Sequence, residues 1–151
     1  MQVIMTKLVN EITINASVKK VWQVLVNVEE LATYDPTVRK STKTSPSNSG
    51  IGASRKVDMQ DGKNWFKETT TVCKPHEALT YQLTACSFPV SDLKHSYSFQ
   101  KIGNKTKVTQ IMEYDMQYGF LGKLLDMFMV RKQTDSGIKK FFGGLKTYIE
   151  K

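Results

Sequence analysis

The chain has 151 residues, of which 40% are hydrophobic and 24% are charged, and its formal net charge is +8 at pH 7. This length fits a single domain covering residues 1–151, and the composition is that of a globular protein with a substantial core. No segment approaches the ~18 consecutive apolar residues of a membrane span. The first eight residues also lack the apolar stretch of a signal peptide, so we expect a cytoplasmic protein.

The positive charge is spread along the chain and forms no dense basic tract or nucleic-acid-binding motif. We therefore expect a solvated basic surface, no nucleic-acid partner and at most weak peripheral contact with a membrane. Cys73, Cys86, His76 and His95 do not have the spacing of metal ligands, so the sequence predicts reduced thiols, no metal site and no cofactor. The oligomeric state, monomer or homodimer, is left open.

The N-terminal part of the chain predicts a strand followed by two short helices. Residues Leu8–Ile14 alternate and favour β-structure. Ser17 is a typical helix N-cap before Val18–Val26, in which apolar residues recur at helical spacing. A second short helix is expected over Glu29–Thr33 and ends before Pro36, because the residue that precedes a proline avoids the helical region.

Strand and turn signals then alternate as far as Met116. The predicted strands are Val38–Thr44, Ile51–Gln60, Lys63–Cys73, Leu79–Cys86, Leu93–Lys101 and Thr106–Met116. Residues Phe120–Ile149 predict one amphipathic helix of roughly 45 Å, which is long enough to lie diagonally across a whole sheet. A curved sheet that is closed by one such helix encloses a space.

Several short motifs accompany this order of elements. They are Ile14, Ala16, Val21, Trp22 and Leu25 around the first helix, then Tyr34, Pro36 and Val38, Gly50-Ile-Gly52 with Arg55, Pro75 with Leu79 and Tyr81, and Gly144-Leu-Lys146. With these residues the chain resembles the START/SRPBCC superfamily, which includes birch-pollen-allergen-like, polyketide cyclase/dehydrase-like and lipid-transport proteins. The resemblance implies an α+β helix-grip fold, in which a seven-stranded curved antiparallel sheet, two short helices and a long C-terminal helix enclose a cavity.

The dipeptide Asp61-Gly62 allows the inner face of the sheet to be predicted from geometry. A two-residue turn there pairs Gln60 with Lys63 and, further along the hairpin, Arg55 with Glu68. We place the more apolar face toward the helix. Continued through the later strands, the predicted inner face consists of Ile51, Ala53, Arg55, Val57, Met59, Asn64, Phe66, Glu68, Thr70, Val72, Leu79, Tyr81, Leu83, Ala85, Leu93, His95, Tyr97, Phe99, Val108, Gln110, Met112 and Tyr114.

Arg55 and Glu68 lie opposite each other on this face and allow two interpretations. They form a cross-strand ion pair that satisfies two buried charges, or Arg55 holds an anionic or carbonyl head group that Glu68 orients. His95 is the predicted inner-face group that titrates near neutrality, so His95 and Glu68 are candidates for acid–base catalysis. No Ser/His/Asp or Cys/His arrangement accompanies them, and a histidine satisfied by its neighbours is the alternative.

The polar stretch Arg131–Gly137 interrupts the apolar stripe of the long helix. It is either a solvated turn with close packing at Gly137 or a bend that shapes the entrance to the cavity. The neighbouring segment Met127-Phe128-Met129 either belongs to the core or forms an adaptable cavity wall, since methionine fits irregular surfaces.

An apolar cavity with a few polar groups is typical of small-molecule sites. The predicted ligand-binding residues are Arg55, Phe66, Glu68, Tyr81, Leu83, His95, Tyr97, Gln110, Met112, Tyr114 and Phe128. We expect binding or transport of a small hydrophobic ligand, such as a lipid, isoprenoid or polyketide-like compound. The alternatives are a cyclase/dehydratase-like enzyme that uses acid–base residues of the cavity and a partner-binding module, because the fold alone does not separate these functions.

Overall fold

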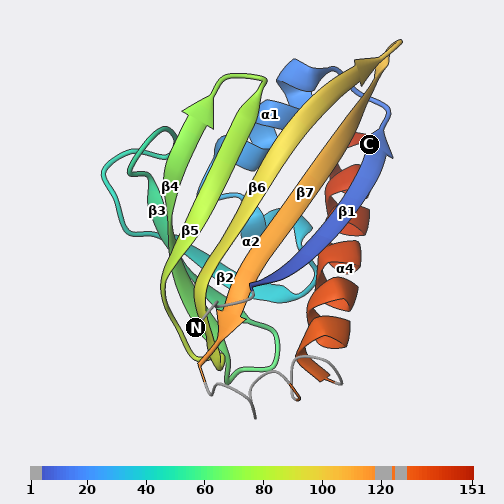
Figure 1. Cartoon of the computed structure of the whole chain (residues 1–151). Coiled ribbons are helices and arrows are strands. Elements are labelled where there is room, and N and C mark those ends of the chain that lie inside the picture. The colour runs from blue at the N-terminus through green and yellow to red at the C-terminus, as the bar shows by residue number, and fades with distance from the viewer. Residues whose placement is uncertain (1–4, 118–123, 125–128) are drawn as a thin grey trace.

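The structure is a computed structural model that describes residues 5–117, 124 and 129–151. Its main element is a curved antiparallel sheet of seven strands in the order β1-β7-β6-β5-β4-β3-β2 (Figure 1). The strands are β1 Thr6–Ile14, β2 Val38–Lys43, β3 Ser54–Met59, β4 Trp65–Lys74, β5 Ala78–Cys86, β6 Val90–Ile102 and β7 Lys105–Met116. The later strands form a continuous meander, and β1 pairs with β7 at one edge.

The helices lie together on one side of this sheet (Figure 1). They are α1 Val18–Val26, α2 Leu31–Tyr34 and α4 Arg131–Ile149. The Ser17 side chain accepts a hydrogen bond from the Lys20 amide at 3.2 Å, so it caps α1 as predicted. None of the helices in the described ranges is long and apolar enough to cross a bilayer. This arrangement is the helix-grip fold that the sequence predicts.

The two halves of α4 have different surroundings. The described helix is a rod of roughly 28 Å, and the predicted helical residues 120–123 and 125–128 lie outside the described residues. Its second half buries Phe141, Phe142, Leu145 and Ile149 in the core against α1, α2 and β1. Met129, just before the helix, is 53% exposed, so a core position for this methionine is wrong.

The β3–β4 hairpin has the predicted register but not the predicted turn. Arg55 pairs with Glu68 as expected. The connection is closed by Met59, whose amide donates to the Asn64 carbonyl at 3.0 Å, and it is therefore longer than a two-residue turn at Asp61-Gly62. A two-residue type I′ turn needs a positive φ at both central residues, whereas of these two only the glycine has one, at 73°. The register is unchanged because the longer loop is centred on the same dipeptide.

A β-bulge in β4 changes which residues face inward in the first part of the predicted inner face. The pairing of β4 with β5 skips Thr71, so Cys73 packs against the core in the place expected for Val72. Ile51 precedes β3 in a turn and is 68% exposed. The inner position predicted for Val72 is therefore wrong, because simple alternation does not include the extra residue of a bulge. The inner position predicted for Ile51 is wrong because this residue lies in the turn before β3 and not in the strand.

A second bulge, in β5, changes which residues face inward near the end of that strand. Leu83 pairs with Glu68 and Ala85 with Lys67, so Thr84 is the extra residue. After it, Ala85 is exposed and Cys86 packs toward the core. The inner position predicted for Ala85 is wrong for this reason. Local strand bending is the usual consequence of a bulge.

Candidate ligand-binding cavity

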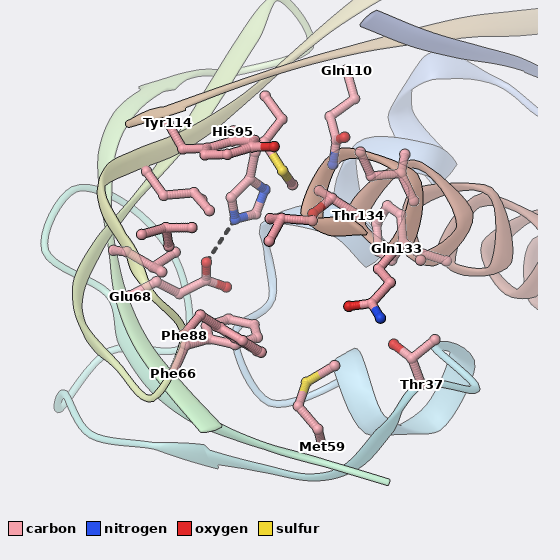
Figure 2. Close-up of a pocket in the computed structure, with 18 of the residues that line it drawn as sticks. Thr37, Met59, Phe66, Glu68, Phe88, His95, Gln110, Tyr114, Gln133 and Thr134 are labelled. Carbon is pink, nitrogen blue, oxygen red and sulfur yellow. Dashed lines mark hydrogen bonds and ion pairs between the residues drawn. The ribbon is translucent and has the colours of Figure 1, made fainter. Parts of the chain in front are cut away.

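A cavity of about 300 Å³ lies between the sheet and the first half of α4 (Figure 2). Strands β3 to β7 form one wall, and α2, the residues after it, the β5–β6 connection and α4 form the others. Its volume is at the lower end of the range for small-molecule sites. The apolar lining residues are Leu31, Met59, Phe66, Leu83, Phe88, Pro89, Val90, Leu93, Met112, Val130, Ile138 and Phe141.

Most residues predicted to contact a ligand line this cavity. They are Phe66, Glu68, Leu83, His95, Tyr97, Gln110, Met112 and Tyr114. Arg55 and Tyr81 are buried but do not line it. Phe128 lies outside the described residues.

The Glu68 carboxylate is the centre of the polar part of the wall. Its Oε1 atom accepts a hydrogen bond from Arg55 Nε at 2.6 Å. Its Oε2 atom lies 2.6 Å from His95 Nε2, and Figure 2 shows this contact as a dashed line. Glu68 is 1% exposed, and charge-assisted hydrogen bonds are strong in such an environment. Arg55 and Glu68 therefore form the cross-strand ion pair that their register predicts.

Arg55 holds Glu68 from behind the cavity wall. Its guanidinium carbon lies 4.5 Å from the centroid of the Tyr81 ring, a cation–π arrangement. The Tyr81 hydroxyl donates to the Leu25 carbonyl of α1 at 2.7 Å, so this hydroxyl does not point into the cavity. Arg55 and Tyr81 thus connect the sheet to the helical layer and fix the position of Glu68.

Hydrogen bonds continue from His95 to Gln110. The Tyr97 hydroxyl lies 3.0 Å from His95 Nδ1, and Gln110 Nε2 donates to the same hydroxyl at 2.9 Å. Because this hydroxyl accepts from Gln110, it can donate its own proton to Nδ1. His95 Nε2 then carries the proton that is donated to Glu68. Both ring nitrogens of His95 are therefore engaged with other protein groups.

Burial and neighbouring charges determine the protonation states on this wall. Burial alone would raise the pKa of Glu68, but the charge of Arg55 and the hydrogen bonds from His95 and Arg55 lower it to about 2. Burial would lower the pKa of Arg55, and Glu68 more than offsets this, so the pKa of Arg55 is raised. Burial raises the pKa of Tyr97 well above its ordinary value. At neutral pH the wall therefore contains a carboxylate and a neutral phenol, and a guanidinium cation lies behind it.

The lowered pKa of Glu68 predicts a defined loss of stability in acid. The pKa is 4.5 in the ordinary case and about 2 in the folded protein. The contribution of Glu68 to the free energy of unfolding is complete above pH 4.5 and is lost as the pH falls through about 2. Between the two, the unfolded chain binds one more proton than the folded chain. The free energy of unfolding should therefore fall by about 1.4 kcal/mol per pH unit because of this carboxyl.

Urea unfolding of the parent and of Glu68→Gln, at several pH values from about 5 to 3, measures this contribution. The parent should lose stability faster than the variant as the pH falls, because every other carboxyl is common to both proteins. Parallel curves for the two proteins would contradict the prediction.

The polar stretch Arg131–Gly137 forms part of the cavity wall. Gln133, Thr134 and Gly137 line the cavity and recur at helical spacing. A Cβ atom built on Gly137 would meet nothing within 4 Å, so close packing at this glycine is wrong. The position of this stretch agrees with the interpretation in which it shapes the cavity. The helical spacing of Gln133, Thr134 and Gly137 can be read from the sequence, but the sequence does not show which face of the helix borders the cavity.

Asp35, at the end of α2, is a cavity residue that sequence analysis missed. Its Oδ1 atom accepts hydrogen bonds from the Thr37 amide at 2.9 Å and from the Thr37 hydroxyl at 2.8 Å. Burial raises the pKa of Asp35, and these hydrogen bonds offset only part of the effect. The side chains of Thr37 and Gln133 extend toward each other from opposite sides (Figure 2). In the described part of the chain, no His, Cys, Asp and Glu side chains gather as metal ligands would.

Solved structures with the same fold include proteins of different kinds. A START superfamily protein from Mycobacterium smegmatis has a TM-score of 0.78 at 11% identity, covering 95% of this chain and 97% of that one. A norcoclaurine synthase point mutant from Thalictrum flavum, in complex with a transition-state analogue, has a TM-score of 0.77 at 14% identity, with coverage of 99% and 96%. The di-domain ARO/CYC BexL from the BE-7585A biosynthetic pathway has a TM-score of 0.79 at 18% identity, with coverage of 97% and 50%.

At these identities the similarity shows the fold alone. No curated protein matches the sequence. The family evidence comes from the sequence itself, since residues 5–150 match the family model described as polyketide cyclase / dehydrase and lipid transport. That match covers nearly the whole chain, and the strand order and α4 agree with it. The chain therefore belongs to the polyketide cyclase/dehydrase and lipid transport family.

Proposed function

We propose that this protein binds a small hydrophobic molecule in the cavity and carries it without chemical change. The observation that supports this most directly is the cavity itself, whose wall is largely apolar. Such a lining favours an apolar ligand, and the few polar groups orient it. A lipid, an isoprenoid or a polyketide-like compound fits this description.

The state of the polar wall supports binding rather than catalysis. An acid–base catalyst works best when its pKa is near the operating pH. The pKa of Glu68 is lowered to about 2, which makes it a weak base. Both nitrogens of His95 already have protein partners, so neither is available to a ligand proton without breaking a contact.

Binding of a neutral fluorescent probe, N-phenyl-1-naphthylamine, tests this function when it is combined with a variant that fills the cavity. Gly137→Met places a side chain in the cavity from α4, since this glycine lines it and leaves space for a Cβ atom. We expect the affinity for the probe to fall by about tenfold or more, equivalent to ~1.4 kcal/mol. The stability of the folded variant should stay the same or rise, because glycine is unfavourable inside a helix.

Gly143→Met is the matched control. It makes the same substitution in the same helix at an exposed position that also has nothing within 4 Å of a built Cβ. Probe binding should be unchanged in this variant. Equal affinities in Gly137→Met and the parent, or no probe binding by the parent, would refute the proposed site. Native mass spectrometry of protein purified from cells then identifies any apolar molecule that occupies the cavity.

An enzyme of the cyclase/dehydratase type is the second candidate. The observation that favours it is Asp35, an acid that lines the cavity and whose pKa burial raises toward the range of a useful base. Conversion of a bound polyketide-like compound, abolished in Asp35→Asn with binding intact, would support this reading. Unchanged ligand recovered after long incubation would support the carrier.

A further inference from the structure

We propose that the cavity selects ligands whose apolar body carries a hydrogen-bond donor, a hydroxyl or an ammonium group, and that it disfavours carboxylates. This inference rests on the proposed binding function and narrows its ligand class. It follows from three features of the wall: an unpartnered acceptor on Gln110, the sign of the lining charges, and the position of Arg55 behind Glu68.

The first feature is the side-chain oxygen of Gln110. This residue lines the cavity and is 3% exposed. Its Nε2 atom donates to Tyr97, whereas its Oε1 atom has no hydrogen-bond partner among the described residues. A buried acceptor without a partner is energetically unfavourable. A ligand hydroxyl that reaches this oxygen removes that cost, which an apolar group or a carboxylate cannot do.

The orientation of the Gln110 amide follows from the hydrogen bonds around it. His95 Nε2 faces the Glu68 carboxylate at 2.6 Å and donates to it. The Tyr97 hydroxyl accepts from Gln110 Nε2 at 2.9 Å and lies 3.0 Å from His95 Nδ1. If the amide were reversed, its oxygen would compete with His95 Nδ1 for the single proton of the Tyr97 hydroxyl. The orientation with the oxygen free gives both the Tyr97 hydroxyl and His95 Nδ1 a partner.

The second feature is the sign of the charges that line the cavity. The described lining residues include two carboxylates, Asp35 and Glu68, and no lysine or arginine, although the whole chain has a net charge of +8. Glu68 is paired with Arg55, whereas Asp35 forms no salt bridge within the described ranges. A carboxylate ligand would bring a further negative charge into this apolar space, and an ammonium group would find a counter-charge.

The third feature is that Arg55 is not part of the cavity surface. Its Nε atom is bound to Glu68, and its guanidinium group covers the Tyr81 ring. Its Nη1 atom lacks a partner among the described residues, but Arg55 does not line the cavity, and Glu68 does. An anionic head group would meet the Glu68 carboxylate at the wall before it met the guanidinium.

Four ligands with one ring system test the proposal: 2-methylnaphthalene, 2-naphthalenemethanol, 2-naphthylmethylamine and 2-naphthoate. Their affinities are measured at pH 7 on the full chain by displacement of N-phenyl-1-naphthylamine. The alcohol and the amine should bind about 3- to 10-fold more tightly than the hydrocarbon, the effect of one net hydrogen bond. The carboxylate should bind more weakly than the hydrocarbon.

Two variants distinguish the two acceptors. Gln110→Met should remove the gain in affinity of the alcohol over the hydrocarbon. Asp35→Asn should reduce the gain in affinity of the amine, and its side-chain oxygen can still accept the hydrogen bonds from Thr37. Asp58→Asn is the control, because it changes the net charge by the same amount as Asp35→Asn. Asp58 lies on β3 near Lys56 and does not line the cavity, so its replacement should leave the affinities of the alcohol and the amine relative to the hydrocarbon unchanged. Binding of 2-methylnaphthalene by each variant shows that its cavity is intact.

Three results would overturn the proposal. If 2-naphthoate binds most tightly, Arg55 is the anchor and the ligand is an anion. If all four ligands bind equally, the polar wall does not select, although the proposed binding function stands. If neither the four ligands nor the probe binds, both the proposed function and this inference fail.

Discussion

Replacing Glu68 by glutamine should lower the free energy of unfolding by about 3–5 kcal/mol, because it leaves the buried Arg55 guanidinium without a counter-charge. Arg55 has its short contact with Glu68 Oε1 and no other ion-pair partner in the described ranges. For a chain of this length the expected fall in Tm is roughly 6–20 °C. Thermal and urea unfolding of the purified variant measure the effect.

The matched control is Glu113→Gln. Glu113 forms an ion pair with Lys94 at 3.7 Å, and both side chains are partly exposed, so its loss should cost less than about 1 kcal/mol. The two variants change the net charge by the same amount. Replacing both members of the buried pair, in Arg55→Met with Glu68→Gln, should recover part of the lost stability. Equal stabilities of Glu68→Gln and Glu113→Gln would contradict the role given to the buried pair.

Gly144→Ala should destabilise the fold by about 1–3 kcal/mol, since α4 and the end of α2 touch at this glycine. A Cβ atom there would collide with the Tyr34 carbonyl oxygen and lie 2.9 Å from Pro36 Cδ. Backbone atoms cannot move aside as the end of a flexible side chain does. We expect a lower Tm and also weaker probe binding, because displaced residues after α2 would move Asp35 and Thr37 at the cavity.

Gly143→Ala supplies the comparison for this prediction. The neighbouring glycine is exposed, and nothing lies within 4 Å of its built Cβ atom. Alanine should therefore stabilise the helix at that position by up to about 1 kcal/mol. The same substitution at adjacent positions should thus have effects of opposite sign. Two changes in Tm of the same sign and size would show that the contact at residue 144 does not constrain the fold.

The sequence predicts β6 and β7 well because both are long and keep a regular alternation over most of their length. His95 and Tyr97 therefore face Met112 and Gln110 as expected. The errors at the ends of β4 and β5 have one cause. A bulge adds a residue without changing the character of the sequence, and Thr84 is as acceptable in a regular strand as in a bulge.

The polar site was predictable only in part. Strand register places Arg55 opposite Glu68, but it fixes Cα positions and does not say which of two long side chains ends at the cavity surface. Asp35 follows α2 in the sequence and meets the cavity only through tertiary structure. Residues in connecting segments have no periodicity from which their direction can be inferred.

The bulge at Thr84 has a consequence for how such a cavity can change in evolution. Substitutions alter one wall position at a time. If the bulge were lost while Thr84 stayed in the strand, plain alternation would instead turn Ala85 inward and Cys86 outward. The residues just beyond, Phe88 and Pro89, line the cavity and would shift with them. A change that removes the bulge in β5 would therefore alter several wall positions at once, and with them the binding specificity, on an unchanged fold.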